Sequence, residues 1–72
     1  MDNKLYMNGE EFPREYDGYE FNLYFDYFYD RLEYGFLMTY EKNGSELLCV
    51  YNNDLFECIQ EFRERCQELE II

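Results

Sequence analysis

Apolar and polar residues alternate along residues 19–29, where the sequence reads YEFNLYFDYFY. Aromatic residues and one leucine occupy the odd positions, while Glu20, Asn22 and Asp26 fall among the even ones. Alternation with a period of two is typical of a β-strand that buries one of its faces. The pattern therefore predicts a strand over residues 19–29, with an aromatic face that forms the floor of a core.

A second alternating run covers residues 32–41, and it matches the first when the chain folds back at Asp30 and Arg31. In this antiparallel register an apolar residue meets an apolar residue at every position, which is how a hydrophobic pattern specifies strand pairing. The expected pairs are Phe21 with Tyr40, Leu23 with Met38, Phe25 with Phe36, Tyr27 with Tyr34, and Tyr29 with Leu32.

The dipeptide Asn43-Gly44 predicts another tight hairpin, because both residue types tolerate the positive φ angles of the turn. A third strand is then expected over residues 46–51. The expected pairs are Tyr40 with Leu47, Met38 with Cys49, Phe36 with Tyr51, and Glu41 with Glu46. The two glutamates form a mildly unfavourable like-charge pair. In this register the second face of the sheet carries acids together with Leu37, Leu48 and Val50.

The last part of the chain changes to a helical period. Asp54 is a suitable N-cap, and Glu57 follows it by three residues. A helix is expected over residues 54–70, with one apolar stripe made by Leu55, Ile59, Phe62, Cys66 and Leu69, and with Cys58 beside it. The stripe would pack on the aromatic face of the sheet, since an apolar sheet face and an apolar helix face bury each other.

The N-terminal residues allow two interpretations. Lys4–Met7 followed by Asn8-Gly9 forms either a short edge hairpin or a single strand that leads into a loop. With either arrangement the predicted fold is α+β: a three- to four-stranded antiparallel meander covered on one face by a C-terminal helix. At 72 residues the chain has room for a single domain, residues 1–72.

The charge balance narrows the choice of partner. The formal net charge is −11, from 17 acidic and 6 basic residues, whereas a magnitude of about 2–8 keeps a small domain soluble. Such a chain is unsuited to direct binding of DNA, RNA or an anionic membrane, because those ligands require basic patches. The charge favours a strongly basic protein partner.

The sequence offers little to catalysis or to metal binding. It has no histidine, no glycine-rich phosphate loop and no EF-hand spacing, and its cysteines (Cys49, Cys58 and Cys66) lack a zinc spacing. Asp26 and Asp30 are the acids considered as an acid and base pair, but nothing places them in a cleft. We expect no enzymatic activity, no metal and no cofactor. Neither a signal peptide nor a membrane span is evident, and free thiols suit a cytoplasmic location.

One face of the predicted helix is acidic. Glu57, Glu61, Glu64 and Glu68 fall within a sector of about 60°, nearly opposite the apolar stripe. Successive carboxylates are one turn apart, a spacing similar to that of phosphates along a nucleic-acid strand. This helix row, with Glu20, Asp26 and Asp30 as a second patch, predicts an inhibitor or regulator that mimics nucleic acid on a basic nucleic-acid-handling protein.

In size, charge and aromatic content the chain resembles small phage-encoded acidic inhibitors, the DNA-mimic antirestriction and anti-CRISPR proteins. The resemblance covers no specific motif, and it implies an inhibitor that acts in a host cytoplasm. The alternative is a structural protein that forms a homodimer through the second sheet face, at Leu37, Leu48 and Val50. An antitoxin that masks a basic toxin is a third possibility.

Overall fold

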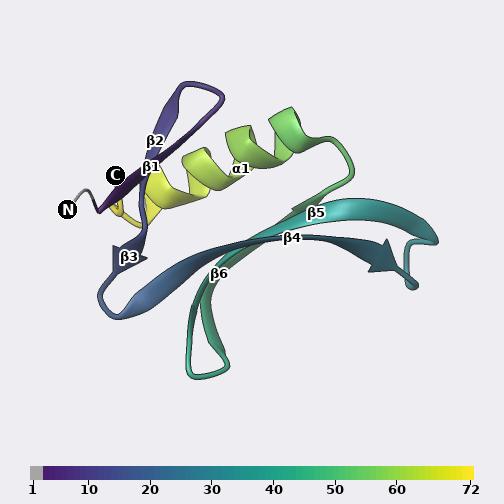
Figure 1. Cartoon of the computed structure of the whole chain (residues 1–72), viewed down its shortest axis with the longest axis horizontal. Coiled ribbons are helices and arrows are strands. Elements are labelled where there is room, and N and C mark those ends of the chain that lie inside the picture. Colours follow the sequence, from purple (N-terminus) through teal and green to yellow (C-terminus); the bar gives the residue numbers. More distant parts are fainter. Residues whose placement is uncertain (1–2) are drawn as a thin grey trace.

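The computed structural model describes residues 3–72. The elements in chain order are β1 (Lys4–Met7), β2 (Glu10–Pro13), β3 (Glu15–Tyr16), β4 (Tyr19–Phe28), β5 (Glu33–Lys42), β6 (Ser45–Asn52) and α1 (Leu55–Glu68). β3 to β6 form one antiparallel sheet in chain order, and β1 pairs with β2 as a separate hairpin. Figure 1 shows α1 lying across one face of the sheet, with the β1–β2 hairpin beside its C-terminal half. The predicted α+β fold is confirmed.

The N-terminal hairpin is the first of the two arrangements that the sequence allowed. Lys4 pairs with Pro13 and Met7 with Glu10, around the turn at Asn8 and Gly9. The hairpin does not extend the main sheet as a strand. The fourth strand of that sheet is instead the short β3, which the sequence pattern did not indicate.

The register between β4 and β5 is the predicted one. Phe21 faces Tyr40, Leu23 faces Met38, Phe25 faces Phe36, and Tyr27 faces Tyr34. The ladder closes at Phe28 and Glu33, so the predicted pair of Tyr29 with Leu32 is wrong. Residues 29–32 form the turn instead, with Leu32 at a φ of 54° and a hydrogen bond from the Arg31 N–H to the Phe28 carbonyl.

The register between β5 and β6 departs from the prediction after one step. Glu41 faces Glu46 as expected, but a β-bulge then intervenes, and Tyr40 faces Leu48 instead of Leu47. One extra residue moves every later side chain of β6 to the opposite face of the sheet. Leu48 and Val50 therefore lie in the core, at 3% and 4% exposure, and not on the second face. The bulge thus places Leu48 and Val50 opposite Tyr40 and Met38, at the positions predicted for Leu47 and Cys49, and Asn52 opposite Phe36, at the position predicted for Tyr51.

The core forms where the hairpin, the helix and the first half of β4 meet. Phe62 of α1 is fully buried, and its ring centroid lies 5.6 Å from Phe12, 5.6 Å from Phe21 and 5.3 Å from Tyr40. The buried hydroxyl of Tyr40 donates a 2.8 Å hydrogen bond to the carbonyl of Pro13. Cys58 and Cys66 are buried in the same core, as the helical pattern predicted.

The aromatic face of β4 is only partly a floor for the helix, which corrects the expectation from its alternation. Tyr19 and Phe21 pack against the core, whereas Leu23, Phe25 and Tyr29 are exposed. Figure 1 shows the reason: the β4–β5 hairpin extends past the end of α1, toward the right of the view. The helix of 14 residues is too short to cover strands of 10 residues along their whole length, because a helical residue rises about 1.5 Å and a strand residue about 3.3 Å.

Both ends of α1 are capped. The Asp54 carboxylate accepts a 3.0 Å hydrogen bond from the Glu57 N–H, which confirms the predicted N-cap. At the other end Glu70 adopts a φ of 59°, and the Ile71 N–H donates to the Cys66 carbonyl over 2.8 Å. This is a Schellman arrangement, in which a left-handed residue ends the helix. The regular helix is therefore Leu55–Glu68, slightly shorter than the predicted 54–70.

The buried thiols predict a loss of stability in alkaline solution. Burial raises the pKa of Cys58 to about 11 and that of Cys66 to about 12, whereas an unfolded cysteine ionises near about 8.5. Stability is therefore fully present below the unfolded pKa and is lost as the pH rises toward the folded values. Each thiol that ionises only in the unfolded chain lowers the unfolding free energy by about 1.4 kcal/mol per pH unit. Urea unfolding between pH 7 and 10 measures this slope, and a C58A/C66A variant should show a shallower one.

Candidate acidic interaction surface

Strand pairing places four glutamates side by side on the second face of the sheet. Glu15 lies opposite Glu20, Glu20 opposite Glu41, and Glu41 opposite Glu46. Directly opposed residues of an antiparallel sheet point to the same face, and neighbouring strands are about 4.8 Å apart. These residues, which we name the sheet row, therefore form a line of about 14 Å across all four strands of the main sheet.

The sheet row contains like charges that no cation relieves. Within residues 3–72 no ion pair involves a member of the row. Glu41 at its centre is held by two donors: Tyr24 Oη donates to its Oε2 over 2.7 Å and Thr39 Oγ1 over 2.5 Å. The bonds from Thr39 and Tyr24 hold the pKa of Glu41 below its ordinary value. The hydrogen bond between Tyr24 and Glu41 also raises the pKa of the Tyr24 hydroxyl. The sheet therefore fixes an ionised carboxylate among three like-charged neighbours.

A shallow depression of about 310 Å³ adjoins the row on the same face. Its lining combines acids with apolar side chains: Tyr24, Asp26, Phe28, Leu37, Thr39, Glu41 and Glu46. Asp26 belongs to the predicted second patch, and its Oδ1 accepts a 2.7 Å hydrogen bond from the Tyr27 N–H. The depression is a partly apolar site next to the carboxylates, where a side chain of a partner can bind.

The predicted second patch is not a single surface. Glu20 is the second residue of β4 and Asp30 lies two residues after its end, so a strand rise of about 3.3 Å per residue separates them by about 30 Å. Glu20 joins the sheet row, Asp26 joins the depression, and Asp30 lies in the β4–β5 turn. Glu15, Glu41 and Glu46 were absent from the predicted site. The register of Phe21 with Tyr40 already implied that Glu20 faces Glu41, whereas Glu15 required the unpredicted β3.

The helix row stands on the exposed side of α1, as predicted. Glu57, Glu61, Glu64 and Glu68 are all exposed, and none of them belongs to an ion pair within the part of the chain that the structure describes. The Asn52 side-chain amide donates to Glu61 Oε1 over 2.8 Å. A polar depression of about 340 Å³ beside Glu57 and Glu61 also includes Glu33 and Arg31. The helix row and the sheet row belong to different layers, and the depression at Glu57 and Glu61 extends to Glu33 and Tyr51 of the sheet.

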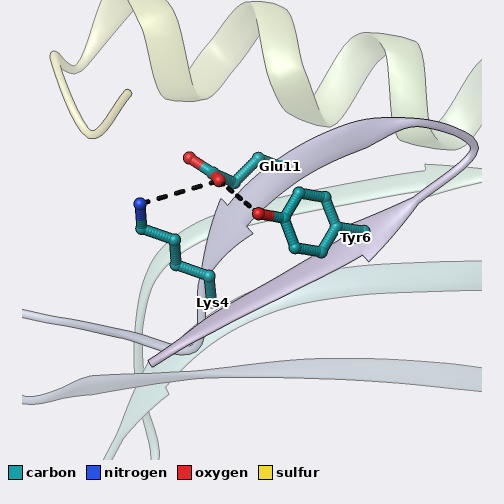
Figure 2. Close-up of polar contacts among 3 residues, drawn as sticks. All are labelled: Lys4, Tyr6 and Glu11. Carbon is teal, nitrogen blue, oxygen red and sulfur yellow. Dashed lines mark hydrogen bonds and ion pairs between the residues drawn. The ribbon is translucent and has the colours of Figure 1, made fainter. Parts of the chain in front are cut away.

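Basic residues are used elsewhere in the fold. Glu11 of β2 accepts a 2.8 Å hydrogen bond from Tyr6 and lies 3.7 Å from Lys4 Nζ, as Figure 2 shows. Glu10 is paired with Arg63. The Arg31 guanidinium lies 4.3 Å from the centroid of the Tyr51 ring. The acids of the β1–β2 hairpin are thus neutralised, while those of the two rows are not.

Leu37, Leu48 and Val50, the residues of the predicted dimer surface, do not form one exposed surface. Leu48 and Val50 belong to the core because of the β-bulge, and Leu37 is half-buried in the depression beside the sheet row. Cys49 and Tyr51 lie on the second face instead, opposite Thr39 and Leu37, and Leu47 is the extra residue of the bulge. Leu47 and Cys49 are exposed, while the Tyr51 hydroxyl donates to Glu33 Oε2.

No cluster of three or more His, Cys, Asp or Glu side chains between residues 3 and 72 is arranged to hold a metal ion. None of the helices described there is long and apolar enough to cross a membrane. Comparison with protein-family models, with curated proteins and with solved structures finds no match to this chain. The geometry of the acidic surfaces is therefore the basis for a functional proposal.

Proposed function

We propose that this protein is a non-enzymatic inhibitor or regulator that binds the basic nucleic-acid site of another protein and competes with its nucleic acid. Partners of this chemistry include nucleases and restriction-type or CRISPR-type effectors, which suits an origin in a phage or mobile element and action in a host cytoplasm. The observation that carries the proposal is the sheet row, in which Glu15, Glu20, Glu41 and Glu46 stand together and form no ion pair with residues 3–72.

The sheet row lowers the folding stability of the protein, and the requirements of the fold do not explain why it is present. Like charges directly opposite each other on neighbouring strands destabilise a sheet, and each such pair costs a few tenths of a kcal/mol or more. Strand pairing fixes the backbone positions of the row, and two hydrogen bonds also hold the Glu41 carboxylate, so binding a cationic groove requires less ordering than a flexible acidic segment would. Carboxylates held in a line resemble a phosphate backbone in charge and in spacing, and complementary charges accelerate association.

The helix row is the other candidate contact surface. Its carboxylates are spaced by one helical turn. They are also exposed, so they are accessible to a cationic groove. Because the rows belong to different layers of the fold, we treat them as alternative contact surfaces. We assign the primary contact to the sheet row, since its charges are closer together and one of its carboxylates is fixed by hydrogen bonds.

Charge reversal on the sheet row should separate binding from stability. In an E20K/E46K variant two lysines flank Glu41, so the like-charge pairs become attractive and the unfolding free energy should rise by about 0.5–1 kcal/mol. Binding to the basic partner should weaken about 100-fold, at roughly tenfold for each reversed contact. The partner is first captured from a host lysate with the wild-type protein, identified, and shown to be displaced by duplex DNA. Affinities are then measured by calorimetry.

An E61K/E64K variant is the matched control, because it changes the net charge by the same amount on the helix row. A larger loss of affinity in this control would assign the contact to the helix row instead. Equal losses in both variants would show that net charge alone matters and would contradict a specific row. Failure of DNA to displace the captured protein would contradict nucleic-acid mimicry.

A further inference from the structure

A cluster of exposed aromatic residues covers the part of the sheet that extends past α1. Phe25 and Tyr34 are each 61% exposed and stack with ring centroids 5.6 Å apart. Phe36 and Tyr27 flank them at 4.9 Å and 5.0 Å. We name this cluster the aromatic patch: Leu23, Phe25, Tyr27, Tyr34 and Phe36. Large exposed apolar patches on small proteins mark interaction surfaces.

The strand that carries the patch also has an open edge. β3 pairs with β4 only at Tyr19 and Glu20, and the next contact is the hydrogen bond from the Phe21 N–H to the Arg14 carbonyl. From Asn22 to Phe28 no described strand pairs with this edge. Natural sheets protect long edges with prolines, charged side chains or bulges. This stretch has no proline and no bulge, since its register with β5 is continuous, and its one charged side chain is Asp26.

The direction of the backbone N–H and C=O groups along the free edge of β4 follows from the alternation of residues in a strand. The Phe21 N–H points away from β5, so the backbone groups of Leu23, Phe25 and Tyr27 point the same way. The Tyr27 N–H accordingly bonds the Asp26 side chain and not a strand. Leu23 and Phe25 therefore present their amides and carbonyls at an edge next to the aromatic patch, which is the geometry for strand addition.

The charge distribution identifies the occupant. On the face of β4 and β5 that carries the patch, the charged residue is Lys42, which lies 5.5 Å from the ring centroid of Tyr19 at the other end of these strands, so the patch itself is uncharged. A basic partner would gain little on this uncharged surface. A second copy of a chain with a net charge of −11 can approach most easily on this face, where acids are absent; Asp26, the one acid of the edge stretch, belongs to the other face of the sheet.

The free edge is also complementary to itself. Antiparallel pairing centred on Phe25 uses all of the stretch from Asn22 to Phe28 and stops before the segment at Arg14. Phe25 then faces its symmetry mate, Leu23 faces Tyr27, and Tyr24 faces Asp26, so no two carboxylates are opposed. A two-fold axis through this point is perpendicular to the sheet and makes the contact isologous.

We propose that two copies of this protein pair through the free edge of β4, centred on Phe25, so that their aromatic patches merge and their sheets become continuous. Both helices then lie on one side of the joined sheet, and both sheet rows lie on the other. The inference is independent of the proposed function, since the dimer contact involves none of the acidic rows.

Three measurements on the intact protein test the proposal. Sedimentation should show a dimer whose dissociation constant falls as salt is added, because screening weakens the repulsion between like-charged copies. Hydrogen exchange of the Leu23 and Phe25 amides should slow as the protein concentration rises. A Phe25→Glu substitution places two carboxylates opposite each other and should raise the dissociation constant at least about 100-fold.

Phe56→Glu is the matched control, because Phe56 is 62% exposed but lies on the helix away from β4. The control should remain dimeric, and circular dichroism should show that both variants are folded. An equimolar mixture of F25E and F25K proteins should recover a heterodimer, since opposite charges then meet. A wild-type protein that stays monomeric at millimolar concentration in high salt would overturn the proposal, as would an F25E variant that dimerises like the wild type.

Discussion

Phe62→Ala is expected to remove a large share of the protein's folding stability. Phe62 is fully buried and is the ring that Phe12, Phe21 and Tyr40 all contact, so its removal leaves a cavity at the junction of helix, hairpin and sheet. Truncating a buried phenylalanine costs about 3–5 kcal/mol. A domain of 72 residues has about 4–11 kcal/mol of total stability. Urea denaturation followed by circular dichroism measures the loss.

Phe56→Ala is the control for this variant, since both phenylalanines belong to α1. Phe56 is largely exposed, so its truncation should change the unfolding free energy by no more than about 0.5 kcal/mol. Similar losses for the two variants would show that the helix does not pack on the sheet as described.

Gly35→Ala is expected to destabilise the protein by about 1–3 kcal/mol through steric overlap. A Cβ at this position would lie 2.4 Å from Cε2 of Tyr51. The Tyr51 ring cannot easily move, because its hydroxyl bonds Glu33, the Arg31 guanidinium covers one side, and Phe28 packs against it at 4.5 Å. The glycine is thus required by a close approach of backbone and ring.

A Tyr51→Ala background tests this explanation. If the clash is the cause, Gly35→Ala should cost little in that background, because no ring remains to be displaced. The double-mutant cycle then gives a coupling free energy of about 1–2 kcal/mol. An unchanged cost in the double variant would show that the effect comes from the backbone of β5 and not from Tyr51.

Alternation was sufficient to predict the strands and most of their pairing. From Phe21 to Tyr27 every predicted partner in β5 is confirmed, because a one-residue slip would have exposed a whole aromatic face. The Asn43-Gly44 turn and the cap at Asp54 were equally predictable, since each depends on local residue types. The helix row also followed from its spacing, although its role in binding stays a prediction.

The local pattern of apolar and polar residues could not predict the β-bulge. Both registers of β6 bury apolar residues, and the choice depends on how Leu48 and Val50 fit beneath α1. The exposed end of β4 was missed for a similar reason, because alternation indicates which residues share a face but not how far the helix covers them. To predict the sheet row, the registers of three strand pairs must be known: β3 with β4, β4 with β5, and β5 with β6. β3 has only two residues and therefore gives no periodic signal.

The position of α1 after all the strands has a consequence for synthesis of the chain. Met38, Tyr40 and Leu48 are buried only when α1 docks on the sheet, so a ribosome exposes the aromatic strands before it makes their cover. Such intermediates are prone to aggregate through unpaired edges. The acids distributed along the strands keep nascent chains apart by mutual repulsion during that interval. We therefore expect the negative charge that we propose for binding a basic partner to limit aggregation before the protein has folded as well.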